Sequence, residues 1–132
     1  MTARELLSRH LSFIGVGATA EETALVYSPN VVSEFPYAPP DHTRRLEGPD
    51  ALIGFLGRIG TFAEDIVIHP PTIYDTATGL IAEYKGESVF KESGRKYEQD
   101  YVAVVTVEDG LITHISEYYD PLRVLRAMGE ID

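Results

Sequence analysis

An Asp-Gly pair between two apolar segments is the feature that most constrains this chain. Asp109 and Gly110 separate two runs that are rich in β-branched and aromatic residues. Because both central residues of a two-residue hairpin turn need positive φ, Asp-Gly at this position predicts an antiparallel β-hairpin. Further turn signals separate the apolar segments that come before this hairpin. Because tight turns join antiparallel neighbouring strands, the second half of the chain is expected to form one antiparallel sheet. Its strands are expected at residues 66–74, 80–90, 97–107 and 111–119.

The first half of the chain predicts helices. Two Thr-x-x-Glu capping boxes, at residues 2–5 and 19–22, each begin a helix by satisfying free backbone N–H groups. A third helix is predicted from Pro49, because proline is tolerated in the first turn. A strand at residues 31–35 and a short last helix over residues 121–128 complete the order. This order predicts an α+β fold in which a curved antiparallel sheet wraps around three N-terminal helices and leaves a pocket between them.

Length and charge limit the class of protein. The 132 residues suffice for one core, so we expect a single domain over residues 1–132. Eleven basic against 21 acidic residues leave a net charge of −10, which disfavours nucleic acid and anionic membranes as partners. The absence of cysteine excludes disulfides and thiolate catalysis. No signal peptide or membrane-spanning run is recognisable, and we expect a cytoplasmic protein.

The two-residue turn also predicts which side chains share a face of the last hairpin. It pairs Val102 with Glu117 and leaves Asp100 on the diagonal. Because side chains alternate along a strand, Gln99 and Tyr101 fall on the opposite face. The face that carries Glu117 is then shared by Asp100, Val102, Val104, Ile115 and Tyr119.

Glu117 is the leading catalytic candidate on this face. A carboxylate among aliphatic side chains loses hydration, which raises its pKa. Asp100, about 7–8 Å away on the diagonal, would push the two pKa values apart, so that one site holds both a proton donor and a base. His69, at a strand end before two prolines, is a candidate proton shuttle. In the alternative interpretation the two acids are solvated or paired with arginines, and His69 is structural.

The remaining candidates concern the walls of the pocket and metal binding. Phe35 and Tyr37 belong to a rigid aromatic turn, which either rims the pocket or is a packed strand exit. No histidine pair has the H-x-H or H-E-x-x-H spacing, so no metal site is predicted.

Several short motifs, in their order and spacing, resemble the SnoaL-like branch of the nuclear transport factor 2-like superfamily. The closing segment, with Asp-Gly-Leu-Ile followed by Ser-Glu-Tyr-Tyr-Asp-Pro, is also similar to phenazine-biosynthesis A/B-type proteins. The motifs lie at residues 27–36, 46–52, 82–87, 94–101, 109–112 and 116–121.

The resemblance implies a cone-shaped α+β barrel with a deep pocket, usually a homodimer joined through its sheets. Such relatives include ketosteroid isomerases, polyketide cyclases and limonene-epoxide-type hydrolases, which use acid–base chemistry without a cofactor. In the phenazine-type relatives a glutamate in the closing strand is the acid/base, and Glu117 matches it. The ketosteroid isomerase groups are not matched: their base falls at Phe35, their oxyanion-hole tyrosine near Leu11, and their second acid near Val102.

The sequence therefore predicts a small cofactor-free acid/base enzyme of the isomerase, cyclase or hydratase type, acting on a hydrophobic small metabolite. The alternative is a non-catalytic ligand-binding or dimerisation module of the same fold. The predicted catalytic residues are Glu117, Asp100 and His69. The predicted pocket-lining residues are Phe35, Tyr37, Val102, Val104, Ile115 and Tyr119.

Overall fold

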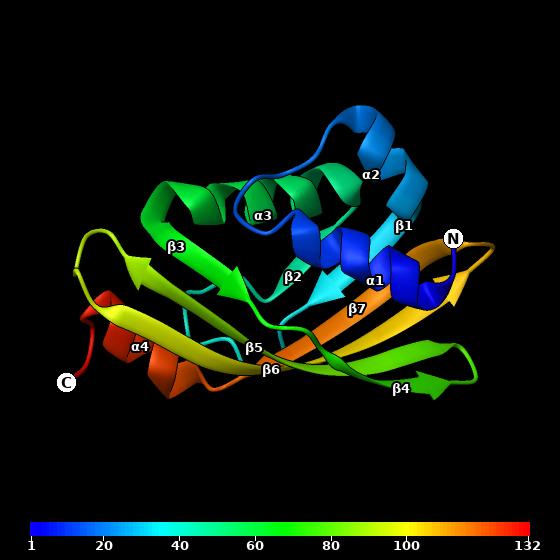
Figure 1. Ribbon diagram of the computed structural model, residues 1–132. Coiled ribbons are helices and arrows are strands. Elements are labelled where there is room, and N and C mark those ends of the chain that lie inside the picture. The colour runs from blue at the N-terminus through cyan, green and yellow to red at the C-terminus, as the bar shows by residue number, and fades with distance from the viewer.

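Four helices and a curved seven-stranded sheet form the fold, described by a computed structural model of residues 1–132. The helices are α1 (Ala3–Ser12), α2 (Ala20–Val26), α3 (Pro49–Phe62) and α4 (Pro121–Met128). The strands are β1 (Tyr27–Glu34), β2 (Arg45–Glu47), β3 (Ala63–Ile68), β4 (Thr72–Thr76), β5 (Gly79–Phe90), β6 (Lys96–Glu108) and β7 (Leu111–Tyr119). Helices α1 to α3 lie over the concave face of the sheet, and α4 lies at one end (Figure 1). The α+β fold predicted from the sequence is confirmed.

Local sequence signals account for most of the element boundaries. Both capping boxes form, with the Thr2 and Thr19 hydroxyls accepting from backbone N–H groups. The side chain of Asp120 caps α4, which ends at Gly129 in the left-handed conformation. The strand predicted over residues 66–74 is instead divided into β3 and β4, because the two prolines after His69 lack the backbone N–H that a continuous strand needs.

The sheet is mixed, and the prediction of a purely antiparallel sheet is wrong in one pairing. The strand order is β2-β1-β7-β6-β5-β3, with β4 also paired to β5. Strand β1 runs parallel to β7, whereas every other pair is antiparallel. Most of the chain separates β1 from β7, so no tight turn fixes their relative direction.

A β-bulge sets the register of the last hairpin. Asp109 and Gly110 both have positive φ, as the turn requires. The ladder then shifts between Thr106 and Val107, because β7 carries one extra residue there. Beyond the bulge Glu117 pairs with Ala103, not with Val102. The predicted register is therefore wrong by one residue, and a shift of one residue exchanges the two faces of β6.

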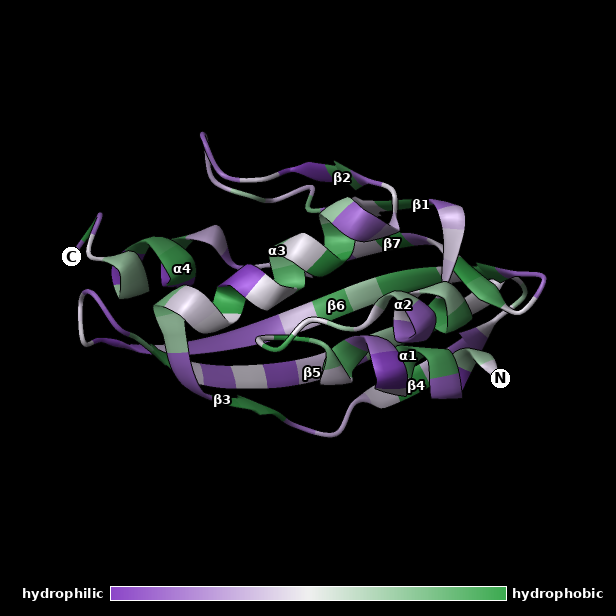
Figure 2. Cartoon of the chain, turned by 90° about the horizontal axis from the view of Figure 1, so that it is seen from above, coloured by the Kyte–Doolittle hydropathy of each residue, from purple (hydrophilic) through white to green (hydrophobic).

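The apolar core occupies one end of the molecule. Leu6, Val26, Leu52, Leu80 and Ile112 are at most 1% exposed and pack α1, α2 and α3 onto the sheet. A smaller cluster joins α4 to β5 and the start of β3. Seen from above, β6 changes from hydrophobic residues near the last turn to hydrophilic ones near α4 (Figure 2). None of the helices is both long and apolar enough to cross a membrane.

Candidate functional site

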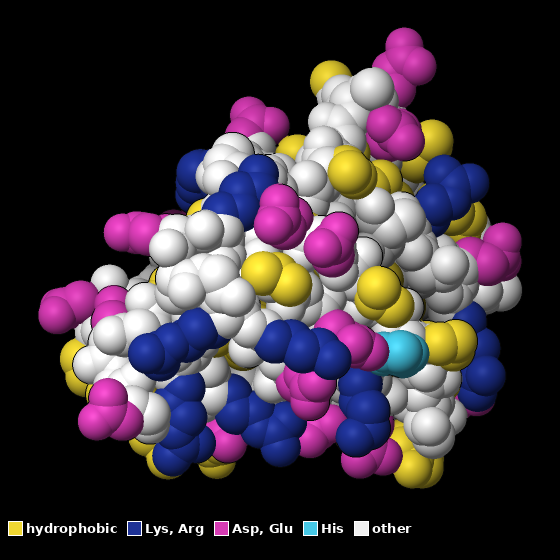
Figure 3. Space-filling model, turned by 60° about the vertical axis from the view of Figure 1, so that its left-hand side comes forward, with side chains coloured by type: hydrophobic (Ala, Val, Ile, Leu, Met, Phe, Trp, Pro, Cys, Tyr) yellow, Lys and Arg dark blue, Asp and Glu magenta, His cyan; other side chains and the backbone are white.

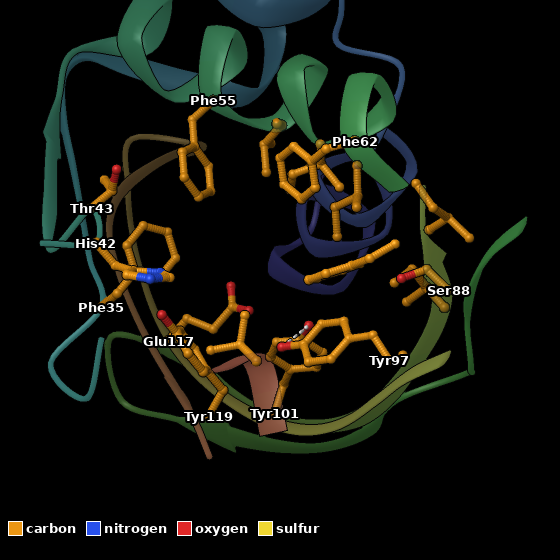
Figure 4. A pocket seen from close by; sticks show the side chains of 18 of the residues that line it. Phe35, His42, Thr43, Phe55, Phe62, Ser88, Tyr97, Tyr101, Glu117 and Tyr119 are labelled. Atoms are coloured by element: carbon orange, nitrogen blue, oxygen red, sulfur yellow. Dashed lines mark hydrogen bonds between the residues drawn. The ribbon is translucent and has the colours of Figure 1, made fainter. Parts of the chain in front are cut away.

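A cavity of about 440 Å³ lies where α3, α4 and the inner face of the sheet meet. Fifteen of its 22 lining residues are hydrophobic, which suits an apolar ligand. Figure 4 shows the side chains of α3 on one side and those of β6 and β7 on the other. The aromatic lining residues are Phe35, Phe55, Phe62, Tyr84, Phe90, Tyr97, Tyr101 and Tyr119.

Three acidic residues, Asp41, Glu87 and Glu117, line this cavity, and Glu117 is the one whose pKa burial raises. Its side chain leaves β7 and points into the open space between the aromatic rings (Figure 4). Loss of hydration raises the pKa of Glu117 to about 7, and the Tyr84 hydroxyl opposes this rise to a smaller degree. At neutral pH the carboxyl group therefore exists in both protonation states, as a group that both accepts and donates protons must.

Tyr84 supplies a second polar atom beside Glu117. The residue is 5% exposed, and its hydroxyl makes no hydrogen bond of standard geometry. Burial, followed by the charge of Glu117, raises the pKa of Tyr84 and keeps the phenol protonated. Its ring stacks on Tyr101, with centroids 5.0 Å apart. A buried donor without a partner costs about 1–3 kcal/mol, so this hydroxyl is a group kept available inside the pocket.

The loop after β1 and α4 also contribute to the lining of the pocket. Asp41, His42 and Thr43 come from the loop, and Val124 and Met128 from α4. The Arg44 guanidinium donates to the Pro36 and Ala38 carbonyl oxygens, over 3.2 and 2.6 Å, which holds the loop in shape. His42 Nε2 lies 3.8 Å from a carboxylate oxygen of Glu130, so the loop touches the segment after α4.

The structure removes Asp100, Val102 and Val104 from the pocket. The bulge turns all three to the outer face of the sheet, where Val102 and Val104 are each 36% exposed. Asp100 accepts from Lys85 Nζ and Arg123 Nη1, each over 3.1 Å. These contacts, the Lys85 hydrogen bond first, hold the pKa of Asp100 below its usual range. In the lower part of the face shown in Figure 3, Lys and Arg side chains lie beside Asp and Glu side chains.

His69 and Tyr37 are likewise outside the pocket. The His69 side chain is 44% exposed and lines a separate groove beside α1. Its Nε2 lies 2.6 Å from Glu87 Oε2, so the ring is held by a residue of β5. Tyr37 is 60% exposed and packs edge-on against Tyr118, because the loop after β1 turns it outward.

The other predictions for the walls have mixed outcomes. Phe35 and Tyr119 line the pocket as predicted. Ile115 is on the predicted face, but it is buried in the main core and does not line the cavity. The sequence reasoning missed Tyr84, Tyr97 and Tyr101. The signal that was available for them is strand alternation. Tyr97, Gln99 and Tyr101 are every second residue and so share one face of β6, and the bulge turns that face toward the cavity, where Tyr101 pairs with Tyr84 of β5.

No group of three or more His, Asp or Glu side chains is placed to hold a metal ion. Glu117 and the hydroxyls of Tyr84, Tyr97 and Tyr101 lie among aromatic rings, an arrangement suited to proton transfer and hydrogen bonding.

The comparisons with known proteins agree with this geometry. A SnoaL-like domain model matches residues 17–115. An uncharacterized PhzA/B-like protein of Pseudomonas aeruginosa is 32% identical over 136 residues, which cover all of this chain and 94% of that protein. A crystal structure from Bacillus subtilis superposes with a TM-score of 0.81 at 29% identity, over 99% of this chain and 98% of that one.

A third similar structure defines the fold more broadly. A Catenulispora acidiphila protein with a ketosteroid isomerase-like fold has a TM-score of 0.78 at 15% identity, covering 98% of this chain and 95% of that one. At this identity the likeness concerns the fold alone. Together with the domain match, it shows that the chain belongs to the SnoaL-like family and has the fold of the nuclear transport factor 2-like proteins.

Proposed function

We propose that this chain is a cofactor-free acid/base enzyme of the isomerase, cyclase or hydratase type that acts on a hydrophobic small metabolite. One observation carries the proposal: Glu117, with its pKa raised to about 7, stands inside an apolar and aromatic pocket. No cation contributes to the pKa of this carboxyl group, so it is not half of a structural ion pair. A perturbed carboxyl group in a cleft is typical of a catalytic site.

The chemistry that fits these groups is proton transfer at a carbon next to a carbonyl. The Glu117 carboxylate takes the proton from that carbon, and the electron pair of the broken C–H bond moves to the carbonyl oxygen as an enolate. Glu117 then returns the proton to another carbon of the conjugated enolate, which gives isomerisation. Alternatively the enolate carbon attacks a second carbonyl of the substrate and Glu117 returns its proton to the alkoxide that forms, which gives cyclisation. Both outcomes need only the substrate and one carboxyl group.

The family supports the same assignment. Glu117 lies in the closing strand, where the resemblance to phenazine-type relatives places the acid/base glutamate. A relative of that type covers the whole chain at 32% identity.

A model reaction tests Glu117 without knowledge of the natural substrate. When a base removes the proton from the ring C–H of 5-nitrobenzisoxazole, the N–O bond breaks and a coloured phenolate is formed. We expect the protein to catalyse this step, and Glu117→Gln to lower the rate about 100-fold or more. Glu108→Gln, which changes an exposed glutamate beside the hairpin turn, is the matched control. Catalysis that survives in Glu117→Gln would contradict the proposal, and binding without any turnover would favour the ligand-binding module instead.

We also propose that two copies associate through the outer face of the sheet. Val102 and Val104 are partly exposed there, and Tyr37 packs on Tyr118 at the same face. Sedimentation should show a dimer of the wild-type chain, and Val104→Lys should shift it to monomer. A monomeric wild-type chain at high concentration would contradict this assembly.

A further inference from the structure

We infer that the hydroxyl pair of Tyr97 and Tyr101, oriented by Gln99, is the site that binds the substrate oxygen on which negative charge develops. Both tyrosines line the cavity, and their hydroxyls lie beside Glu117 in Figure 4. The inference deepens the proposed function and rests on it for the identity of the ligand, an enolate-like oxygen.

Gln99 is a buried amide whose four hydrogen bonds fix its orientation. It is 1% exposed. Its Oε1 accepts from the backbone N–H groups of Asp100 and Asp120, over 3.1 and 3.2 Å. Its Nε2 donates to the Asp120 carbonyl oxygen over 2.8 Å and to the Tyr97 hydroxyl over 3.0 Å. Because Oε1 faces two N–H donors, the amide cannot turn over, and the group that faces Tyr97 must be the NH₂.

This orientation decides what the tyrosines offer to a ligand. The Tyr97 oxygen accepts from Gln99 and also from the Tyr101 hydroxyl, over 3.3 Å. The two tyrosines have two hydroxyl hydrogens, and the hydrogen bond between them uses one. The other hydroxyl hydrogen therefore has no acceptor within the pair, whichever tyrosine is the donor. The Tyr97 oxygen already accepts two hydrogen bonds, and because the Tyr101 hydroxyl donates the bond between the pair, the uncommitted hydrogen is that of Tyr97, which is available to an acceptor in the cavity. The pair is therefore a donor, and a chain of hydrogen bonds strengthens it.

The surroundings favour an oxygen anion as the acceptor. Burial raises the pKa of Tyr97 and of Tyr101, so both phenols stay protonated donors. The two donors to Tyr97 oppose that rise, because they stabilise charge on its oxygen. Donors that are already oriented in a water-poor site stabilise a developing oxyanion without rearrangement. Gln99 does not itself reach the ligand, and we assign it as a positioning residue.

Binding of a stable oxygen anion tests this inference separately from turnover. The probe is 4-nitrophenolate, and 4-nitrotoluene is a neutral analogue of similar shape. Both are titrated into Glu117→Gln, which removes the carboxylate charge that would repel the anion. In that background we expect Tyr97→Phe to weaken 4-nitrophenolate binding about 10- to 100-fold, the usual effect of one hydrogen bond to a charged group. Binding of 4-nitrotoluene should change less than about twofold, because it needs no donor.

Gln99→Glu tests the positioning role in the same background. A carboxylate at this position accepts and does not donate, so the Tyr97 hydroxyl turns toward it and is lost to the cavity. We expect Gln99→Glu to weaken binding of 4-nitrophenolate selectively, as Tyr97→Phe does. If Gln99→Glu does not fold, Gln99→Met is used in its place. Tyr74→Phe, on exposed β4, is the control and should bind both probes as the parent does.

Each outcome has one meaning. A selective loss of 4-nitrophenolate binding supports the donor site, even if Glu117→Gln does not change the rate of the model reaction. Unchanged affinity for the anion, or a parallel loss of both probes, overturns it. Turnover that does not depend on Glu117 contradicts the proposed function alone, because the binding measurement uses no reaction.

Discussion

The Tyr84 hydroxyl and the Glu117 carboxylate are neighbouring buried groups, and the tyrosine lowers the pKa that burial of the glutamate raises. The hydroxyl has no other partner. Desolvation raises the pKa of Glu117 and the Tyr84 hydroxyl lowers it, and the result is a pKa near neutral pH, where a single carboxyl group can act as both acid and base.

Tyr84→Phe should raise the pKa of Glu117 above about 7. Removing a group that favours the charged carboxylate leaves desolvation unopposed. The pH at which the base form appears should move upward, in the 5-nitrobenzisoxazole rate or in the NMR shift of the labelled glutamate carbon. A downward shift would show that Tyr84 does not act on the ionised form.

Glu117→Gln should stabilise the protein at alkaline pH. The pKa of Glu117 is raised from 4.5 to about 7, so the folded state holds its proton more tightly than the unfolded chain does. Wild-type stability should therefore fall as the pH rises from about 4.5 to about 7, by up to roughly 3 kcal/mol. Chemical unfolding of both proteins at several pH values should show a difference that grows over this range and then stays constant. A constant difference across the range would contradict a raised pKa.

His10 should make the protein acid-sensitive. This buried ring lies 2.6 Å from the Tyr27 hydroxyl, and burial lowers its pKa to about 4. The unfolded chain binds the proton near pH 6.5, so acid favours unfolding between about pH 6.5 and pH 4, by up to roughly 3 kcal/mol. His10→Asn keeps a polar group near Nδ1 and should remove this slope, at some loss of stability at neutral pH. An unchanged slope in that variant would place the acid sensitivity elsewhere.

Asp100→Asn should leave turnover unchanged. Its carboxylate pairs with Lys85 and Arg123 on the outer face of the sheet, away from the cavity. Activity measured beside Glu117→Gln separates the two acids directly. A large loss of activity in Asp100→Asn would return this residue to the site.

The sequence alone determined most of the elements of this fold and its leading candidate for the site, Glu117. Capping boxes, turn glycines and prolines are local signals, because a helix end or a hairpin turn is decided by the few residues that form it. Glu117 could be found because it stands between apolar positions of one strand, and because its closing motif resembles that of an acid/base family.

The tertiary structure alone decided what surrounds Glu117. One bulge residue reverses the faces of β6, so that Gln99 and Tyr101 point inward and Asp100 outward. No local sequence signal predicts this bulge, because the Asp-Gly turn is the one expected. The shifted register buries Ala103 and Val105 and leaves Asp100 on the outer face, where it pairs with Arg123. The parallel pairing of β1 with β7 and the hydroxyl pair held by Gln99 likewise join segments that are distant in sequence. Their arrangement depends on long-range packing, which the pattern of a single strand does not contain.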